Sequence, residues 1–171
     1  MTKTKHLTQL QFENHFVPAT GLELKAPPIV LTVVTAALMW LASLAVSAFD
    51  FAVLANAVLP VGLVLAGAIT CLAGVASFRR ARTTVNPMKP DSTAALVVSG
   101  IYSYSRNPMY LGFLLILLGW AVFLSNGLAL LLLPAFVLYM NRFQIRPEER
   151  VLFARFAHDY VAYRASVRRW L

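Results

Sequence analysis

The chain alternates long apolar runs with short polar connections. Residues 29–49 contain no charged side chain, and neither do residues 51–78. Two further apolar runs, 108–124 and 127–140, are separated by the turn-like Ser125-Asn126-Gly127. At about 1.5 Å per residue, about 20 helical residues cross a hydrocarbon layer about 30 Å thick. The pattern predicts four membrane-spanning helices, the last two forming a short hairpin.

Composition agrees with this assignment. Of the 171 residues, 59% are apolar and 13% are charged, and the runs lack the polar face that a soluble hairpin needs. We therefore expect an all-α integral membrane protein with four transmembrane helices, a cytoplasmic central loop and a C-terminal interfacial amphipathic helix. The expected division is an N-terminal cytoplasmic arm (1–28), the first two transmembrane helices (29–78) and a core of loop, hairpin and C-terminal helix (79–171).

Basic residues gather in two of the connections. Between the second and third runs, one acid, Asp91, accompanies five bases: Arg79, Arg80, Arg82, Lys89 and Arg106. Seven arginines follow the fourth run, whereas the connections around Asp50 and Asn126 contain no Lys or Arg. The positive-inside rule places both termini and the central loop in the cytoplasm. The net charge of +8 is thus explained by topology and contact with anionic lipids, without nucleic-acid binding.

The C-terminal segment has one apolar stripe. Its members recur at three- and four-residue steps: Leu152, Phe156, Tyr160, Tyr163 and Val167. This spacing predicts an amphipathic helix lying on the membrane, which could also cover a pocket.

Several kinds of chemistry lack their residues. Cys71 is the only cysteine, and no Cys/His cluster has the spacing of metal ligands. The sequence contains neither a glycine-rich phosphate loop nor a serine-hydrolase elbow. Glu13 and Glu23 make the first 25 residues unlike a cleavable signal peptide, so we interpret them as a cytoplasmic arm.

Two polar segments remain, 83–110 and 142–152. Because a helical hairpin brings its ends together, we expect Arg106-Asn107-Pro108 to lie beside Arg146 to Glu149. This cluster has a structural interpretation: Asn107 and Pro108 start a helix, Arg106 reaches lipid headgroups, and the glutamates are solvated. It also has a functional one, in which a helix N-terminus and an arginine bind an anion and the glutamates bind an ammonium or hydroxyl group.

Four motifs occur in order along the second half of the chain: S-G-I-Y, R-N-P-M-Y-L-G, P-E-E-R-x-L-x-x-x-F and Y-x-x-Y-x-x-x-V-R-R-W-L. Together they resemble the isoprenylcysteine carboxyl methyltransferases, which are related to the membrane phospholipid methyltransferases. The resemblance covers residues 83–171, and its R-N-P-M-Y form is similar to the bacterial branch. It implies a location in the bacterial inner membrane.

The resemblance also implies a reaction and a site. Methyl transfer from S-adenosylmethionine to a lipid-like or prenylated acceptor is expected, with carboxyl methylation favoured. Residues implied to bind the cofactor are Ala94, Ala95, Leu96, Val97, Gly100, Tyr102, Asn107, Pro108, Met109, Tyr110, Glu148 and Glu149. The implied catalytic residues are Arg106, Asn107 and Glu148, and the implied acceptor-binding residues are Arg142, Gln144 and Arg146.

The sequence departs from the eukaryotic pattern at three of these positions. Asn107 and Ala94 stand where eukaryotic members usually have histidine, and Gln144 stands where they have an arginine implicated in acceptor binding. A prenylated cysteine is therefore not fixed as the acceptor. N-methylation of a phospholipid or amine, S-methylation of a thiol, and a non-catalytic lipid-binding role remain as alternatives.

Overall fold

The computed structural model describes residues 23–49, 57–82 and 95–171. Within these ranges every regular element is helical. The main helices are α2 (Pro28–Ala45), α3 (Val58–Arg80), α4 (Pro108–Leu124), α5 (Gly127–Tyr139) and α6 (Arg146–Ser166). The predicted all-α class is confirmed for the described part of the chain.

Three helical stretches are long and apolar enough to cross a membrane: Pro28–Ala45, Val58–Arg80 and Gly127–Ser166, while α4 is shorter. The apolar part of the third stretch ends near Ile145, and α6 beyond it is rich in charged residues. The predicted first run extends too far, because α2 ends at Ala45 and a short 3-10 turn (Ser47–Phe49) follows. The start of the predicted second run and the loop 83–94 lie outside the described residues.

The predicted hairpin of α4 and α5 is confirmed. Ser125 ends α4 in the left-handed conformation, with φ of 53°. Asn126 then caps α5, because its Oδ1 accepts hydrogen bonds from the backbone N–H groups of Leu128 and Ala129. The Asn126 Nδ2 donates to Val46 O at 2.9 Å, which fixes the turn against the end of α2.

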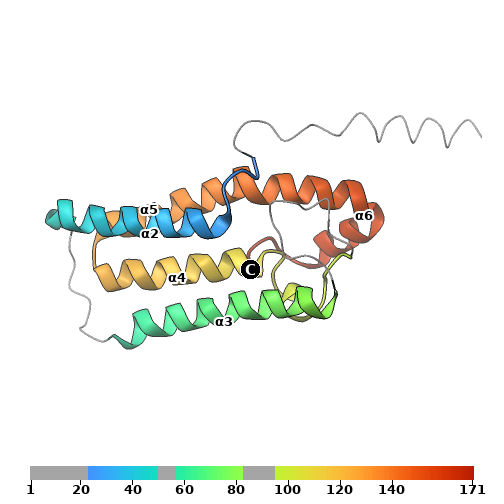
Figure 1. Ribbon diagram of the computed structural model, residues 1–171, viewed down its shortest axis with the longest axis horizontal. Coiled ribbons are helices and arrows are strands. Elements are labelled where there is room, and N and C mark those ends of the chain that lie inside the picture. The colour runs from blue at the N-terminus through green and yellow to red at the C-terminus, as the bar shows by residue number, and fades with distance from the viewer. Residues whose placement is uncertain (1–22, 50–56, 83–94) are drawn as a thin grey trace, which may run out of the picture.

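Helix α4 lies at the centre and contacts α2, α3 and α5 (Figure 1). It lies closest to α3, where glycines replace side chains at the crossing. A Cβ at Gly67 would lie 2.5 Å from Gly112 O, and one at Gly119 would lie 2.8 Å from Pro60 O. The glycines thus allow backbone contact between the helices, which places the end of α3 beside the start of α4.

The fourth apolar helix does not stop at Met140 as predicted. A π-helical turn (η4, Met140–Ile145) joins α5 directly to α6. Within α6 the chain bends at Ala157, whose φ is 35° and ψ is −103°. The segment after the bend returns toward α4, so the C-terminus lies at the start of α4 (Figure 1).

The predicted apolar stripe of the C-terminal segment is confirmed as one cluster. Tyr160, Tyr163 and Val167 are buried together, with Leu152 and Phe156 packed against them. Val167 lies just beyond the end of α6, so the stripe continues past the helix.

Candidate active site

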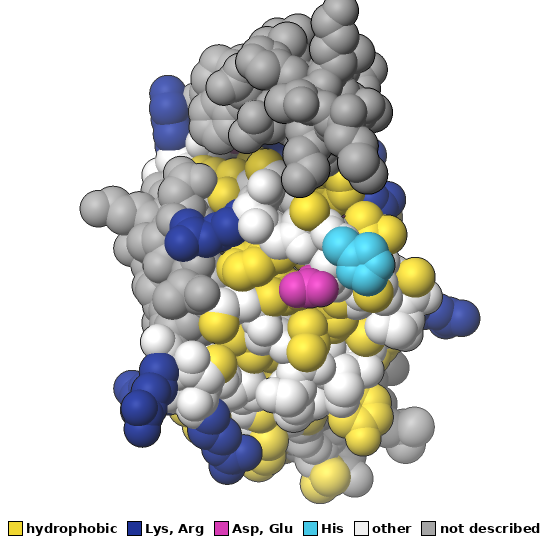
Figure 2. Space-filling model, turned by 90° about the vertical axis from the view of Figure 1, so that its right-hand side faces the viewer, with side chains coloured by type: hydrophobic (Ala, Val, Ile, Leu, Met, Phe, Trp, Pro, Cys, Tyr) yellow, Lys and Arg dark blue, Asp and Glu magenta, His cyan; other side chains and the backbone are white. Residues whose placement is uncertain are grey.

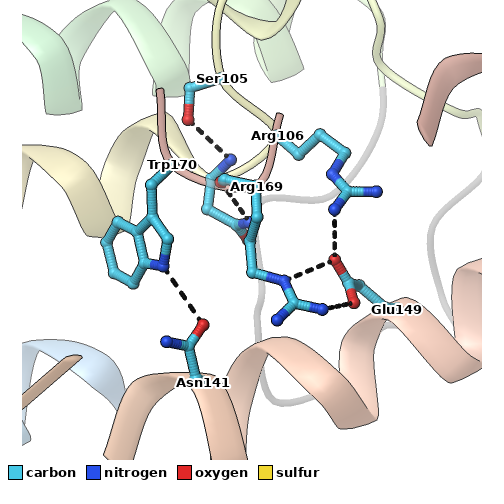
Figure 3. A network of polar contacts seen from close by, with 7 residues as sticks. Ser105, Arg106, Asn141, Glu149, Arg169 and Trp170 are labelled. Carbon is cyan, nitrogen blue, oxygen red and sulfur yellow. Dashed lines mark hydrogen bonds and ion pairs between the residues drawn. The ribbon is translucent and has the colours of Figure 1, made fainter. Parts of the chain in front are cut away.

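Three segments far apart in the sequence meet in one polar network: the start of α4, the first turn of α6 and the last residues of the chain (Figure 3). The proximity of Arg106 to Glu149 that the hairpin predicts is confirmed. Arg106 Nη2 lies 3.1 Å from Glu149 Oε1. A second guanidinium shares this carboxylate, with Arg169 Nε 3.1 Å from Oε1 and Arg169 Nη2 2.5 Å from Oε2.

Arg106 is the most buried cation of this cluster. Its side chain is 9% exposed, and its Nε and Nη1 are buried without a hydrogen-bond partner among the described residues. A guanidinium carries five N–H donors, and leaving buried donors unsatisfied costs about 1–3 kcal/mol each. The side chain therefore presents unused positive donors beside the N-terminus of α4, where the helix dipole also favours an anion.

Glu148 has a different environment from its neighbour Glu149. Tyr110 Oη donates a short hydrogen bond to Glu148 Oε1. Burial raises the pKa of Glu148 to about 8, aided by the nearby Glu149 charge and opposed by the hydrogen bond from Tyr110. The two adjacent acids thus differ in kind: Glu149 is paired with two cations, whereas Glu148 bonds to a neutral phenol.

The last five residues, 167–171, form a C-terminal strap across the start of α4. Arg106 N donates to Arg168 O at 3.0 Å, and Asn107 Nδ2 donates to Arg169 O at 2.9 Å. Trp170 Nε1 donates to Asn141 Oδ1 at 3.2 Å, as Figure 3 shows. Asn107 precedes α4, but its side chain makes no capping hydrogen bond. The interpretation of Asn107 as an N-cap side chain is therefore wrong, because its amide binds the strap instead.

Aromatic side chains line the site next to these charges. Tyr163 Oη donates to Tyr102 O at 2.7 Å, and the Tyr102 ring meets Phe78 of α3 edge-on at 5.3 Å. Burial and the nearby Glu148 raise the pKa of Tyr102 well above its ordinary value, so this phenol stays neutral. Leu96 packs on the cluster of Tyr160, Tyr163 and Val167. The strap and these rings together separate the polar groups from solvent.

The other described residues implied to bind the cofactor differ in their surroundings. Val97 and Pro108 are buried and Ala95 is partly buried, while Ala94 lies outside the described residues. Gly100 and Met109 face α3 instead. A Cβ at Gly100, whose φ is +66°, would lie 2.9 Å from Ser77 Oγ, and the Met109 side chain packs on Gly74.

The three residues implied to bind the acceptor are not equivalent. Arg142 is 53% exposed and pairs with Glu23 at 2.9 Å, and Arg146 is exposed. Gln144 is fully buried: its Nε2 donates to Ala26 O at 2.5 Å, and its Oε1 has no hydrogen-bond partner in the described part of the chain. The structure thus brings Gln144 alone of the three into the interior.

Sequence reasoning missed four polar contributors to this region: Glu23, Asn141, Arg169 and Trp170. The R-R-W-L ending contained a signal for the last two, because a tryptophan and paired arginines at a chain end are unusual in a solvated tail. Glu23 and Asn141 had no such signal.

Known proteins resemble this chain over part of its length. Residues 55–159 match the family model described as phospholipid methyltransferase. An uncharacterized protein of Haemophilus influenzae is 49% identical over 63 residues, which are 37% of this chain and 100% of that protein. The protein-S-isoprenylcysteine O-methyltransferase of Saccharomyces cerevisiae is 37% identical over 82 residues, 46% of this chain but only 33% of the yeast enzyme. No solved structure matches the chain. The chain belongs to the phospholipid methyltransferase family.

Proposed function

We propose that this chain is an integral membrane methyltransferase that takes a methyl group from S-adenosylmethionine and transfers it to a lipid-like acceptor. Four helices cross the membrane in this proposal: α2, α3, α4 and the stretch Gly127–Ile145. The site then lies at their cytoplasmic end. Basic side chains around the rim of this end support the orientation (Figure 2), and Arg79 and Arg80 in the last turn of α3 are both exposed.

The observation that carries the proposal is the pair of buried, unpartnered nitrogens on Arg106. The methyl donor has a carboxylate, an ammonium group and ribose hydroxyls. Arg106 and the N-terminus of α4 suit the carboxylate, since both offer positive donors at one place. Glu148 suits the ammonium when ionised, or a ribose hydroxyl, because its bonded partner among the described residues is the phenol of Tyr110 and not a cation.

Little acid–base chemistry is required of the protein. The donor supplies a methyl group already activated by its sulfonium charge. The chain's own residues hold and orient the reactants and exclude water, which can account for much of a rate enhancement. The buried rings of Tyr102, Tyr160 and Tyr163 suit this purpose, and an aromatic face can also stabilise a cation.

Glu149 is implied by the resemblance to bind the cofactor, but it has a structural role in this proposal. Both of its oxygens already accept from guanidinium groups, so we assign it to holding Arg106 and Arg169 in place. Glu148 remains the acid that contacts the donor.

Carboxyl methylation of a lipid-linked acceptor is the favoured reaction, supported by the O-methyltransferase activity for which the yeast relative is named. A second candidate is N-methylation of a lipid amine. The buried Gln144 Oε1 favours it, because a neutral carbonyl oxygen without a partner is satisfied by an N–H donor and not by a carboxylate.

Two measurements test the proposal. Calorimetry of the detergent-solubilised protein should show binding of S-adenosylmethionine and of S-adenosylhomocysteine. A donor carrying a radiolabelled methyl group should then label a component of a lipid extract, with base-labile label indicating an ester and base-stable label indicating N- or S-methylation. Absence of binding by folded protein would favour a non-catalytic lipid-binding role.

A further inference from the structure

Residues 23–26, just before α2, pack against the π-turn that joins α5 to α6. Among the described residues, polar contacts from Leu24, Glu23 and Ala26 reach the π-turn, and Glu23 also contacts Arg150 of α6, across more than a hundred residues of sequence. These residues lie outside the part of the chain that matches the family model, which begins at residue 55.

The first contact compensates for a proline. Pro147 has no N–H, so it cannot donate to the carbonyl of Phe143 four residues earlier, and its ring would collide with that carbonyl in an α-helix. The π-turn avoids this geometry, as shown by Arg146 N donating to Asn141 O five residues earlier. Leu24 N donates to Phe143 O at 3.0 Å and supplies the missing partner.

The second set of contacts comes from Glu23. Its Oε1 lies 2.9 Å from Arg142 Nη1 in the π-turn, and its Oε2 lies 2.6 Å from Arg150 Nη2 in α6. The carboxylate is 2% exposed, whereas the two arginine side chains are 53% and 44% exposed. Glu23 is therefore the buried partner in both ion pairs, and it links the π-turn to α6 across their junction.

Residue 24 itself shows that tertiary contacts hold this segment. Leu24 has a φ of 56°, a region that non-glycine residues rarely adopt. Such a conformation persists where the surrounding structure imposes it. The contacts of Glu23, Leu24 and Ala26 with the π-turn provide this constraint.

The π-turn determines which way α6 faces. A π-turn contains one residue more than the α-turn it replaces, so relaxation to an α-helix would rotate α6 by about 100° relative to α5. Glu148 meets Tyr110 of α4 only when α6 has the rotation about its axis that the structure shows. Loss of the Glu23 contacts would therefore move a residue of the site that Glu23 does not touch.

We propose that Glu23 is a positioning residue for the methyl-donor site, which locks the π-turn so that Glu148 faces Tyr110. This inference rests on the proposed function for its effect on the donor. The locking of the π-turn by Glu23 does not depend on that function.

The test uses the full chain in detergent and the variant Glu23→Gln, which keeps the size of the side chain and removes its charge. Hydrogen exchange of the amides in residues 141–149 should become about tenfold faster or more, with α3 and α4 little changed. Binding of S-adenosylhomocysteine should weaken by about tenfold, since small displacements of positioned groups have large effects. Asp159→Asn is the matched control, because this acid lies in α6 but is 81% exposed. It should change neither quantity.

A double variant separates positioning from general loosening. If Glu23 acts through Glu148, the affinity of Glu23→Gln/Glu148→Gln should equal that of Glu148→Gln alone. Additive losses would overturn the inference, as would unchanged exchange in residues 141–149. If Glu23→Gln does not fold, Arg150→Gln removes one arm of the contact while Arg142 still neutralises Glu23. It should show a smaller change in the same segment, and a wild-type exchange pattern would contradict the proposal.

The two proposals fail in different ways. If the wild-type protein binds neither S-adenosylmethionine nor S-adenosylhomocysteine, the proposed function fails, and hydrogen exchange still tests the lock. If the wild type binds and Glu23→Gln binds equally well, the role of Glu23 fails and the proposed function stands.

Discussion

Arg106 and Glu149 form an ion pair of 3.1 Å between the start of α4 and the first turn of α6, and Arg169 shares the same carboxylate. The side chains of Arg106 and Glu149 are only 9% and 14% exposed. One buried anion thus lies between two guanidiniums from distant parts of the chain. Glu149 joins three segments, α4, α6 and the C-terminal strap.

Glu149→Gln should therefore destabilise the protein. Removing the carboxylate leaves two guanidiniums close together without their shared partner, and breaking a buried pair costs about 3–5 kcal/mol. The melting temperature in detergent should fall by roughly 6–20 °C, at about 2–4 °C per kcal/mol. Normal stability combined with weaker donor binding would instead make Glu149 a direct ligand.

Arg106→Lys tests the anion site separately from stability. Lysine can keep the ion pair with Glu149, so the melting temperature should change little. A point charge cannot reproduce the planar set of N–H donors, and Nε and Nη1 are the groups left for the donor carboxylate. Affinity for S-adenosylmethionine by calorimetry should fall several-fold. Unchanged affinity would mean that Arg106 serves only the contact with Glu149 or the lipid headgroups.

The raised pKa of Glu148 predicts that donor affinity and protein stability change in opposite directions with pH. Its pKa is raised from 4.5 to about 8. The folded protein therefore holds this proton more tightly than the unfolded chain, so the stabilisation is fully present below pH 4.5 and is lost as the pH rises through about 8. Donor binding that uses the carboxylate should strengthen over the same rise, because more of the group is ionised.

Melting and calorimetry between about pH 6.5 and 8.5 measure both trends. Glu148→Gln removes the titrating group, so both trends should flatten. The affinity of this variant above pH 8 should be lower than that of the wild type by about 1.5–3 kcal/mol, the worth of a hydrogen bond to a charged group. A pH dependence that survives in Glu148→Gln would assign it to another group.

Two glycines of α3 give a matched test of the contact with α4. A Cβ at Gly67 would lie 2.5 Å from the backbone oxygen of Gly112, whereas a Cβ at Gly62 would have nothing within 4 Å. Gly67→Ala must move the helices apart and should cost about 1–3 kcal/mol in stability. Gly62→Ala should leave the melting temperature unchanged or slightly raised. Equal effects of the two substitutions would contradict close packing at Gly67.

The local part of this architecture could be predicted from sequence. Apolar runs gave the helices, Ser125-Asn126-Gly127 gave the hairpin turn, and the hairpin in turn placed Arg106 beside Glu149. The stripe from Leu152 to Val167 gave one packed cluster. Each of these predictions depends on spacing within one helix or one turn, which the sequence encodes directly.

The remaining features depend on contacts between segments far apart in the sequence. Nothing near Glu23 shows that its carboxylate lies between Arg142 and Arg150, and the bend at Ala157 has no proline or glycine to mark it. Pro147 could have indicated that α5 and α6 meet in an irregular turn, because it removes a helical hydrogen bond. The partner that compensates, Leu24 N, could not have been identified without coordinates.

Asn107→Asp distinguishes strap binding from helix capping at the start of α4. Aspartate is nearly the same size, caps a helix about as well as asparagine, and interacts more favourably with the helix dipole. A capping role therefore predicts equal or greater stability. The structure predicts the reverse, because the Asn107 amide donates to Arg169 O and a carboxylate can only accept. Two acceptors would then face each other where a hydrogen bond of 2.9 Å now lies.

The expected result of Asn107→Asp is a loss of about 1–3 kcal/mol, the cost of leaving a buried acceptor unsatisfied. Hydrogen exchange at the Arg106 amide, which donates to Arg168 O of the strap, should accelerate, while exchange in α5 should not. The local readout is decisive, since a weakened helix start would instead affect amides in the first turn of α4. Faster exchange confined to that first turn, with the strap unchanged, would return Asn107 to a capping role and leave the strap held by its contacts with Arg106, Glu149 and Asn141.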